Sequence, residues 1–67
     1  MPPLHDPPLT DAERRVLAVL RGGHSNRAIA AALVLSTRTV EGHISSLLSK
    51  TGCRNRTQLL LWDLARR

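Results

Sequence analysis

Residues 36–51, STRTVEGHISSLLSKT, constrain the fold of this 67-residue chain more than any other stretch. Apolar residues recur there at helical spacing and predict a face packed on a core: Val40, Ile44, Leu47 and Leu48. The opposite, bare face carries small or polar residues: Arg38, Gly42, Ser45, Ser46 and Ser49. Because glycine inside a helix costs about 1 kcal/mol relative to alanine, this pattern predicts a helix that another molecule approaches closely on its bare face.

The segment in front of this helix predicts a shorter helix that crosses it. In residues 24–35, Ser25 or Asn26 offers an N-cap, and one face is apolar: Ile29, Ala30 and Leu33. The shorter helix is expected to end near Leu33 and the next to begin after Ser36, a connection too short for the two to run side by side. This is helix-turn-helix geometry, in which the second helix enters the major groove of DNA and the first crosses the backbone. A helical hairpin in an unrelated bundle is the alternative.

A further helix is predicted on the N-terminal side of this pair. Thr10 and Glu13 have the spacing of a capping box, and the helix is expected to end at Gly22-Gly23. Its inward stripe is Ala12, Val16, Leu17 and Leu20. No strand pattern occurs in the sequence, so the predicted fold class is all-α, a four-helix domain with a central helix-turn-helix.

The last predicted helix, which Asn55 caps with Gln58 at the third helical position, is apolar nearly all round. One stripe, including Leu59 and Leu60, can face the core. A second apolar stripe remains for water or a partner: Thr57, Leu61 and Leu64. Exposed stripes of this kind usually mark an interface, so we expect a homodimer through this helix. The alternative is a fraying end with scattered surface leucines.

The charge distribution favours a polyanionic partner. The chain carries a net charge of +5, and residues 1–20 contribute −1 while the remainder contributes +6. The basic surplus therefore lies in the part that contains the predicted helix-turn-helix. A basic face that is simply solvated is the plain alternative.

The same residues argue against other classes of function. Cys53 is the only cysteine, and with His5, His24 and His43 it shows no metal-ligand spacing, so neither a metal nor a cofactor is expected. His24 and Ser25 are adjacent but no third orienting group is apparent, so no enzyme is predicted. The sequence contains no apolar run long enough to span a membrane and no signal-peptide pattern, and we therefore expect a cytoplasmic protein.

Four blocks of sequence, in order and at intact spacing, carry a family resemblance: LTDAERRVL from Leu9, GGHSNRAIAAALVLS, TRTVEGHISSLLSK, and CRNRTQL ending at Leu59. They resemble the LuxR/FixJ-type (GerE-like) effector domain of bacterial transcription regulators, a four-helix DNA-binding module. The resemblance implies that residues 24–33 form the scaffold helix, that Thr37–Lys50 form the recognition helix and that the last helix is a dimerisation surface. Related domains usually follow a receiver or ligand-sensing domain. Residues 1–8, with four prolines, stand where the joining linker is expected, and residues 9–67 form the DNA-binding domain.

Five residues depart from the family pattern: Glu41, Gly42, Thr51, Cys53 and Asp63. Thr51 and Cys53 stand where relatives usually have larger aliphatic residues. Glu41 stands where many relatives place a basic residue, and Gly42 stands where they have a larger side chain. The base preference of relatives therefore does not transfer to this chain. Asp63 is more polar than expected on the last helix.

The expected partner is double-stranded DNA, with RNA polymerase as a further partner. Base-edge contacts are predicted from Glu41, Gly42, Ser45 and Ser46, with Glu41 accepting from a cytosine amino group or, alternatively, pairing with Arg38. Phosphate contacts, which position without reading sequence, are predicted from Asn26, Arg27, Ser36, Thr37, Arg38, Thr39, Lys50, Arg54 and Arg56. Two rival functions remain: a sigma-factor-like promoter-recognition domain, and a protein-interaction module whose binding to DNA would show little salt dependence.

Overall fold

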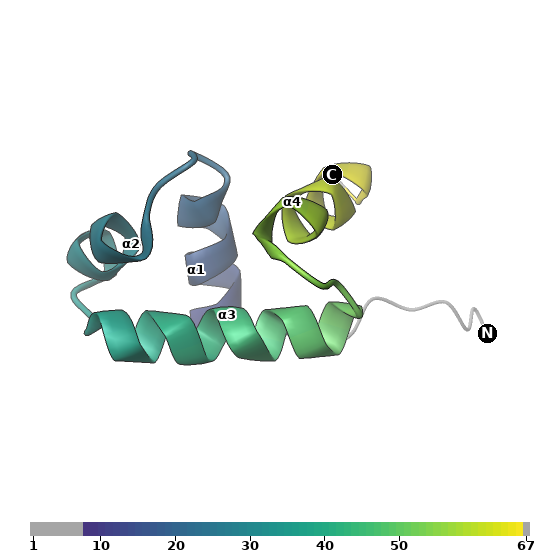
Figure 1. Ribbon diagram of the computed structural model, residues 1–67. Helices are drawn as coiled ribbons and strands as arrows, with labels where there is room; N and C mark the ends of the chain where they lie inside the picture. The colour runs from purple at the N-terminus through teal and green to yellow at the C-terminus, as the bar shows by residue number, and fades with distance from the viewer. Residues whose placement is uncertain (1–7, 67) are drawn as a thin grey trace.

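The computed structural model describes residues 8–66, which form four α-helices. They are α1 (Asp11–Leu20), α2 (Asn26–Leu33), α3 (Thr37–Thr51) and α4 (Arg56–Ala65). The longest, α3, runs along one side of the molecule, and the other three helices pack on its inner side (Figure 1). The predicted all-α fold with a central helix-turn-helix is confirmed. The predicted linker of residues 1–8 lies, apart from Pro8, outside the described residues.

Local capping explains where the first and last helices begin. At the start of α1 the predicted capping box forms, because the Glu13 N–H donates to Thr10 Oγ1 at 3.1 Å and the Thr10 N–H donates to Glu13 Oε1 at 2.8 Å. At the start of α4, Asn55 Oδ1 accepts from the Gln58 N–H at 2.9 Å. The Gln58 side chain reaches one residue further back than in a capping box and accepts from the Arg54 N–H at 2.7 Å.

The connection between α2 and α3 is the tight turn that makes these helices cross. Ser36 caps α3 by accepting from the Thr39 N–H at 3.0 Å. Val34 adopts the left-handed conformation, with φ 57° and ψ 50°, and the Leu35 N–H donates to the Ala30 carbonyl at 2.8 Å. Glycine is usual at such a position, and a side chain there costs roughly 1–2 kcal/mol. Figure 1 shows the result, with α2 seen nearly end-on above the start of α3.

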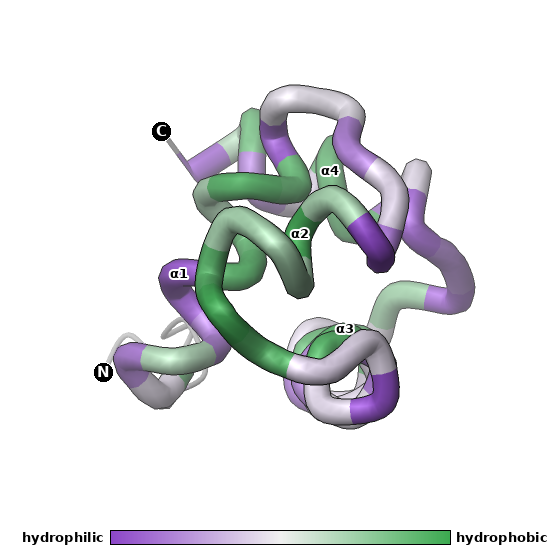
Figure 2. The backbone as a smooth tube through the Cα atoms, turned by 90° about the vertical axis from the view of Figure 1, so that its left-hand side faces the viewer, coloured by the Kyte–Doolittle hydropathy of each residue, from purple (hydrophilic) through white to green (hydrophobic). Residues whose placement is uncertain are grey.

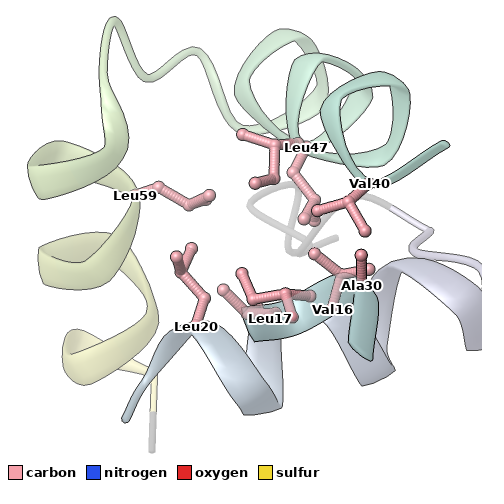
Figure 3. Close-up of a cluster of buried hydrophobic side chains, with 9 residues drawn as sticks. Val16, Leu17, Leu20, Ala30, Val40, Leu47 and Leu59 are labelled. Atoms are coloured by element: carbon pink, nitrogen blue, oxygen red, sulfur yellow. The ribbon is translucent and has the colours of Figure 1, made fainter. Parts of the chain in front are cut away.

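The core is aliphatic and all four helices contribute to it. Its buried members are Val16, Leu17, Leu20, Ile29, Ala30, Val40, Ile44, Leu47 and Leu59. The labelled members point toward one another between the helices in Figure 3. Four residues predicted on inward faces are only half-buried: Ala12, Leu33, Leu48 and Leu60. Each fully buried side chain of Val, Leu or Ile size contributes about 1.5–3 kcal/mol, so this cluster is the main force that holds α3 in place. Within residues 8–66, every helix is too short or too polar to cross a lipid bilayer.

Candidate nucleic-acid interface

One face of α3 is left uncovered by the rest of the domain. In the view along its axis, α1, α2 and α4 all lie to one side of α3 (Figure 2). We define the outer face of α3 by its exposed residues Arg38, Glu41, Gly42, Ser45 and Ser49. Three predicted base-contact residues, Glu41, Gly42 and Ser45, are therefore exposed together on a helix that the core holds in place.

Gly42 is a glycine that the packing of the domain does not require. A Cβ atom placed on Gly42 would meet no atom within 4 Å. Gly52, just after α3, differs because its φ of 72° lies in the region that favours glycine. Gly42 lies inside α3, where alanine is more favourable by about 1 kcal/mol, and no contact among the described residues requires its small size.

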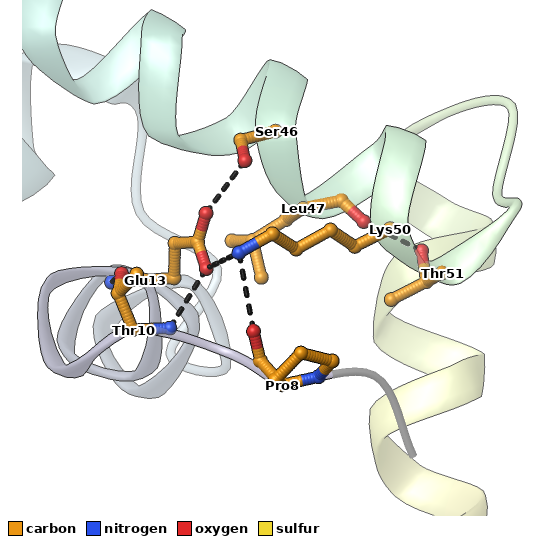
Figure 4. Close-up of polar contacts among 7 residues, drawn as sticks. All are labelled: Pro8, Thr10, Glu13, Ser46, Leu47, Lys50 and Thr51. Carbon is orange, nitrogen blue, oxygen red and sulfur yellow. Dashed lines mark hydrogen bonds and ion pairs between the residues drawn. The ribbon is translucent and has the colours of Figure 1, made fainter. Parts of the chain in front are cut away.

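Ser46 and Lys50 lie on the flank of α3 that faces α1. The Ser46 hydroxyl donates to Glu13 Oε2 at 2.6 Å, and Lys50 Nζ donates to Glu13 Oε1 at 2.7 Å and to the Pro8 carbonyl at 3.2 Å (Figure 4). The prediction that Ser46 belongs to the bare face is wrong. A helical projection places Ser46 away from its own helix's apolar stripe but takes no account of a carboxylate on a neighbouring helix.

Glu13 is a buried, ionised carboxylate, with 3% of its surface exposed. Burial by itself raises its pKa, but hydrogen bonds from Lys50, Ser46 and the Thr10 N–H more than offset this effect, and the pKa falls to about 2. The sequence predicted Glu13 in the capping box but did not predict that its carboxylate is buried. A signal was nevertheless present, because Glu13 precedes Val16, Leu17 and Leu20 at helical spacing and so belongs to the inward face, where a carboxylate needs a cation.

The predicted phosphate ligands differ in how far the domain already uses their side chains. Three exposed arginines make no side-chain hydrogen bond or ion pair with any residue in the described range 8–66: Arg27, Arg38 and Arg54. Arg56 is engaged, since its Nη1 donates to Asn26 Oδ1 at 2.8 Å and its Nη2 to the His24 carbonyl at 3.0 Å. Arg56 and Asn26 thus tie the start of α4 to the start of α2.

The N-terminal end of α3 is exposed and polar. Thr37, Thr39 and Ser36 are all exposed, and the Ser36 hydroxyl donates to Thr39 Oγ1 at 2.9 Å while accepting the Thr39 N–H. Backbone N–H groups in the first turn of a helix favour anions. The ion pair between Glu41 and Arg38, the alternative considered for Glu41, is not formed, and the Glu41 carboxylate has no partner among the described residues.

Asp63 is the second buried carboxylate, and its partner explains why a polar residue occupies the inner face of α4. Asp63 is 4% exposed, and Arg21 donates to it twice, from Nε at 2.6 Å and from Nη2 at 2.8 Å. The bond to Asp63 also raises the pKa of Arg21. This bidentate pair, between residues 42 positions apart in the sequence, joins the end of α1 to α4.

The side of α4 that points away from the core is apolar. Leu61 is 60% exposed and Leu64 is 59% exposed, and Thr57 is exposed one turn earlier. We call these three residues the outer face of α4. Their exposure agrees with the predicted second stripe, while their part in a dimer interface stays a prediction.

Comparison with known proteins identifies the family. Residues 7–62 match the family described as "Bacterial regulatory proteins, luxR family". Among curated proteins, the chain is 44% identical to the "Uncharacterized transcriptional regulatory protein YhcZ" of Bacillus subtilis (strain 168), over 87% of this chain and 30% of that protein. It is 42% identical to the transcriptional regulatory protein DegU of Brevibacillus brevis, over 88% and 24%. It is 37% identical to the response regulator protein VraR of Staphylococcus aureus (strain NCTC 8325 / PS 47), over 81% and 26%.

The matched region therefore spans only 24–30% of the length of these three relatives. The family match over residues 7–62 contains all of α1, α2 and α3 and most of α4, so it covers the helix-turn-helix and the core that supports it. The resemblance noted in the sequence blocks is confirmed, and the chain belongs to the luxR family of bacterial regulatory proteins.

Proposed function

We propose that residues 9–67 are the DNA-binding domain of a bacterial transcription regulator, and that α3 is the recognition helix that enters the major groove of double-stranded DNA. The observation that carries this proposal is the outer face of α3, which is exposed, is not covered by the other helices (Figure 2) and has no side chain at Gly42. Membership in the luxR family and the names of the relatives, which are transcriptional or response regulators, support it. The proposed place of action is the cytoplasm, and no catalytic role is proposed.

The residues at the centre of the outer face of α3 would read the base sequence of the DNA. Glu41 is proposed to accept a hydrogen bond from a cytosine amino group, and Gly42 lets the helix backbone come close enough for this short side chain to reach. Ser45 is proposed as a further, weakly discriminating contact, because a hydroxyl can donate or accept. A base contact by Ser46 stays an untested prediction, since its hydroxyl already bonds Glu13.

Phosphate contacts are proposed first from three of the predicted ligands, arginines whose side chains have no partner among the described residues: Arg27, Arg38 and Arg54. The exposed N-terminal turn of α3, with Ser36, Thr37 and Thr39, is proposed to bind a further phosphate through its backbone N–H groups. Phosphate contacts from Asn26, Lys50 and Arg56 stay predictions outside this proposal. The side chains of these three residues are already hydrogen-bonded within the domain.

A homodimer is proposed through the outer face of α4, residues Thr57, Leu61 and Leu64. A two-fold axis through this face would present two copies of α3 to inverted half-sites roughly 10 bp apart, centre to centre. Contact with RNA polymerase stays an additional prediction.

The decisive experiment is selection of bound sequences from a random DNA library, followed by a salt titration on the selected site. If four to eight phosphates are neutralised per dimer, an estimate from the candidate ligands, log K should fall against log salt with a slope on the order of −4 to −7. Arg38→Ala should make the slope shallower on every sequence, whereas the matched change Arg15→Ala, an exposed arginine of α1, should leave it unchanged.

Two results would point to the rival functions. A flat salt response with no enriched sequence would favour a protein-interaction module. Binding to promoter DNA only when RNA polymerase is added would favour a sigma-like role.

A further inference from the structure

The Glu13 carboxylate holds α3 at two points on one flank. Ser46 and Lys50 are four residues apart, about one helical turn, and bond different oxygens of the same carboxylate, at 2.6 and 2.7 Å. A single contact would let the helix swivel about it. Ser46 and Lys50 lie within about 40° of each other around the helix axis, so a rotation of α3 about that axis would lengthen or break both bonds together.

Lys50 is poorly placed to serve as a phosphate ligand as well. Its side chain is 31% exposed, and its ammonium group is shared between Glu13 and the Pro8 carbonyl. If Lys50 turned outward to a phosphate, it would leave a buried carboxylate without its cation, which is unfavourable. The free energy gained from an exposed contact with a hydrated phosphate is smaller than the free energy lost by leaving the buried carboxylate unpaired. The Arg38 side chain, by contrast, makes no hydrogen bond or ion pair with the described residues.

We infer that Lys50 and Ser46 are positioning residues rather than DNA ligands, and that Glu13, through them, sets the rotation of α3 at which Glu41, Gly42 and Ser45 face the DNA; this rests on the proposed function. Pro8 belongs to the same attachment, since its carbonyl also accepts from Lys50. The segment that enters α1 is thereby tied to the C-terminal half of the recognition helix.

The salt dependence of binding separates positioning from direct contact. In the full 67-residue chain, Lys50→Met should weaken binding to the selected site and reduce the ratio of its affinity to that of a single-base mismatch, while the slope of log K against log salt stays as in the unchanged protein. The matched variant Arg38→Ala should do the opposite. It should lose about 0.9 of slope for each phosphate contact removed and keep the mismatch ratio.

Two results with Lys50→Met would overturn the inference. The first is a loss of slope equal to that of Arg38→Ala with an unchanged mismatch ratio, because that is the signature of a phosphate ligand. The second is an unchanged slope together with an unchanged affinity and ratio. If the unchanged protein itself shows no salt-dependent DNA binding, it is the proposed function that fails.

A measurement without DNA tests the inference independently of the proposed function. Residual dipolar couplings of backbone N–H groups report how α3 is oriented and rotated relative to α1. Ser46→Ala, the milder change, should shift the α3 couplings as one set, and the neighbouring change Ser45→Ala should leave them in place. The circular dichroism of each variant confirms that it is folded. Unchanged α3 couplings in both Ser46→Ala and Lys50→Met would show that Glu13 does not set the rotation of the helix.

Discussion

The outer faces of α3 and α4 are both uncovered, but their chemistry is opposite. The outer face of α3 combines a cation, a carboxylate, a glycine and two serines, all of which water solvates well. The outer face of α4 exposes more than half of Leu61 and of Leu64, which an apolar partner would stabilise by about 25 cal/mol for each Å² removed from water. The interfaces proposed on these two faces should therefore respond differently to salt: binding of DNA to the outer face of α3 should weaken as salt rises, and apolar association through the outer face of α4 should not.

Acid should abolish both interfaces at once, because they depend on the same helical frame. The folded pKa of Glu13 is about 2, below the ordinary value of 4.5. A depressed pKa means that the carboxylate stabilises the fold fully above about pH 4.5 and that this stabilisation is lost as the pH falls from there toward 2. Circular dichroism during acid titration, in moderate urea, measures the loss. Glu13→Gln should be less stable at neutral pH and less sensitive to acid, and an equal sensitivity would show that another group carries the transition.

Leu61→Asp should separate the two faces by removing only the apolar one. Loss of an interface anchor costs about 2 kcal/mol or more, so binding to a paired site should weaken by more than tenfold and lose its cooperativity, while the monomer stays folded. Sedimentation on DNA gives the number of chains per site. Ala18→Asp, which adds the same charge on the exposed side of α1, is the control. One chain per site at saturation in the unchanged protein would mean that Leu61 and Leu64 are scattered surface leucines.

Glu41→Ala sharpens the polar side of the comparison. A cytosine reader should lose roughly 1–3 kcal/mol on the preferred site and relax preference at one base pair, while non-specific binding stays level or rises. Because Glu41 pairs with no cation within residues 8–66, its removal leaves no charge unpaired in the free domain. Fluorescence anisotropy on sites varied one base at a time measures the effect. Equal tightening on every sequence would make Glu41 only a moderator of charge.

Gly42→Ala should have the smallest effect, with opposite signs in the free and bound states. In the free domain the added methyl group meets no atom of a neighbouring element within 4 Å. The free energy of unfolding, measured in urea, should therefore rise by up to about 1 kcal/mol. On DNA the same methyl group should weaken binding, because it holds the helix further from the bases. Gly52→Ala is the contrasting variant and should destabilise the free domain, since its φ is 72°. A Gly42→Ala protein that binds DNA as tightly as the original would remove the case for close approach.

The sequence by itself determined the helices, their caps and the crossing of α2 and α3. Thr10 and Asn55 cap the helices they were expected to cap, and α3 begins after Ser36 as expected. Three of the four residues of the predicted α3 stripe are buried: Val40, Ile44 and Leu47. These features are readable because each depends on residues within a few positions of one another, whose geometry a helix fixes without outside help. The exposed apolar stripe of α4 could be predicted from the sequence for the same reason.

Only the tertiary structure decided which of the polar residues predicted on the bare side of α3 are exposed to solvent. The ties of Glu13 to Ser46 and Lys50 join residues 33 and 37 positions apart, and the pair of Arg21 and Asp63 spans 42. Whether such side chains meet depends on how one helix is rotated and shifted against another. That arrangement depends on the packing of the core together with the polar ties between helices, so neighbouring serines on one helix, Ser45 and Ser46, end in different surroundings.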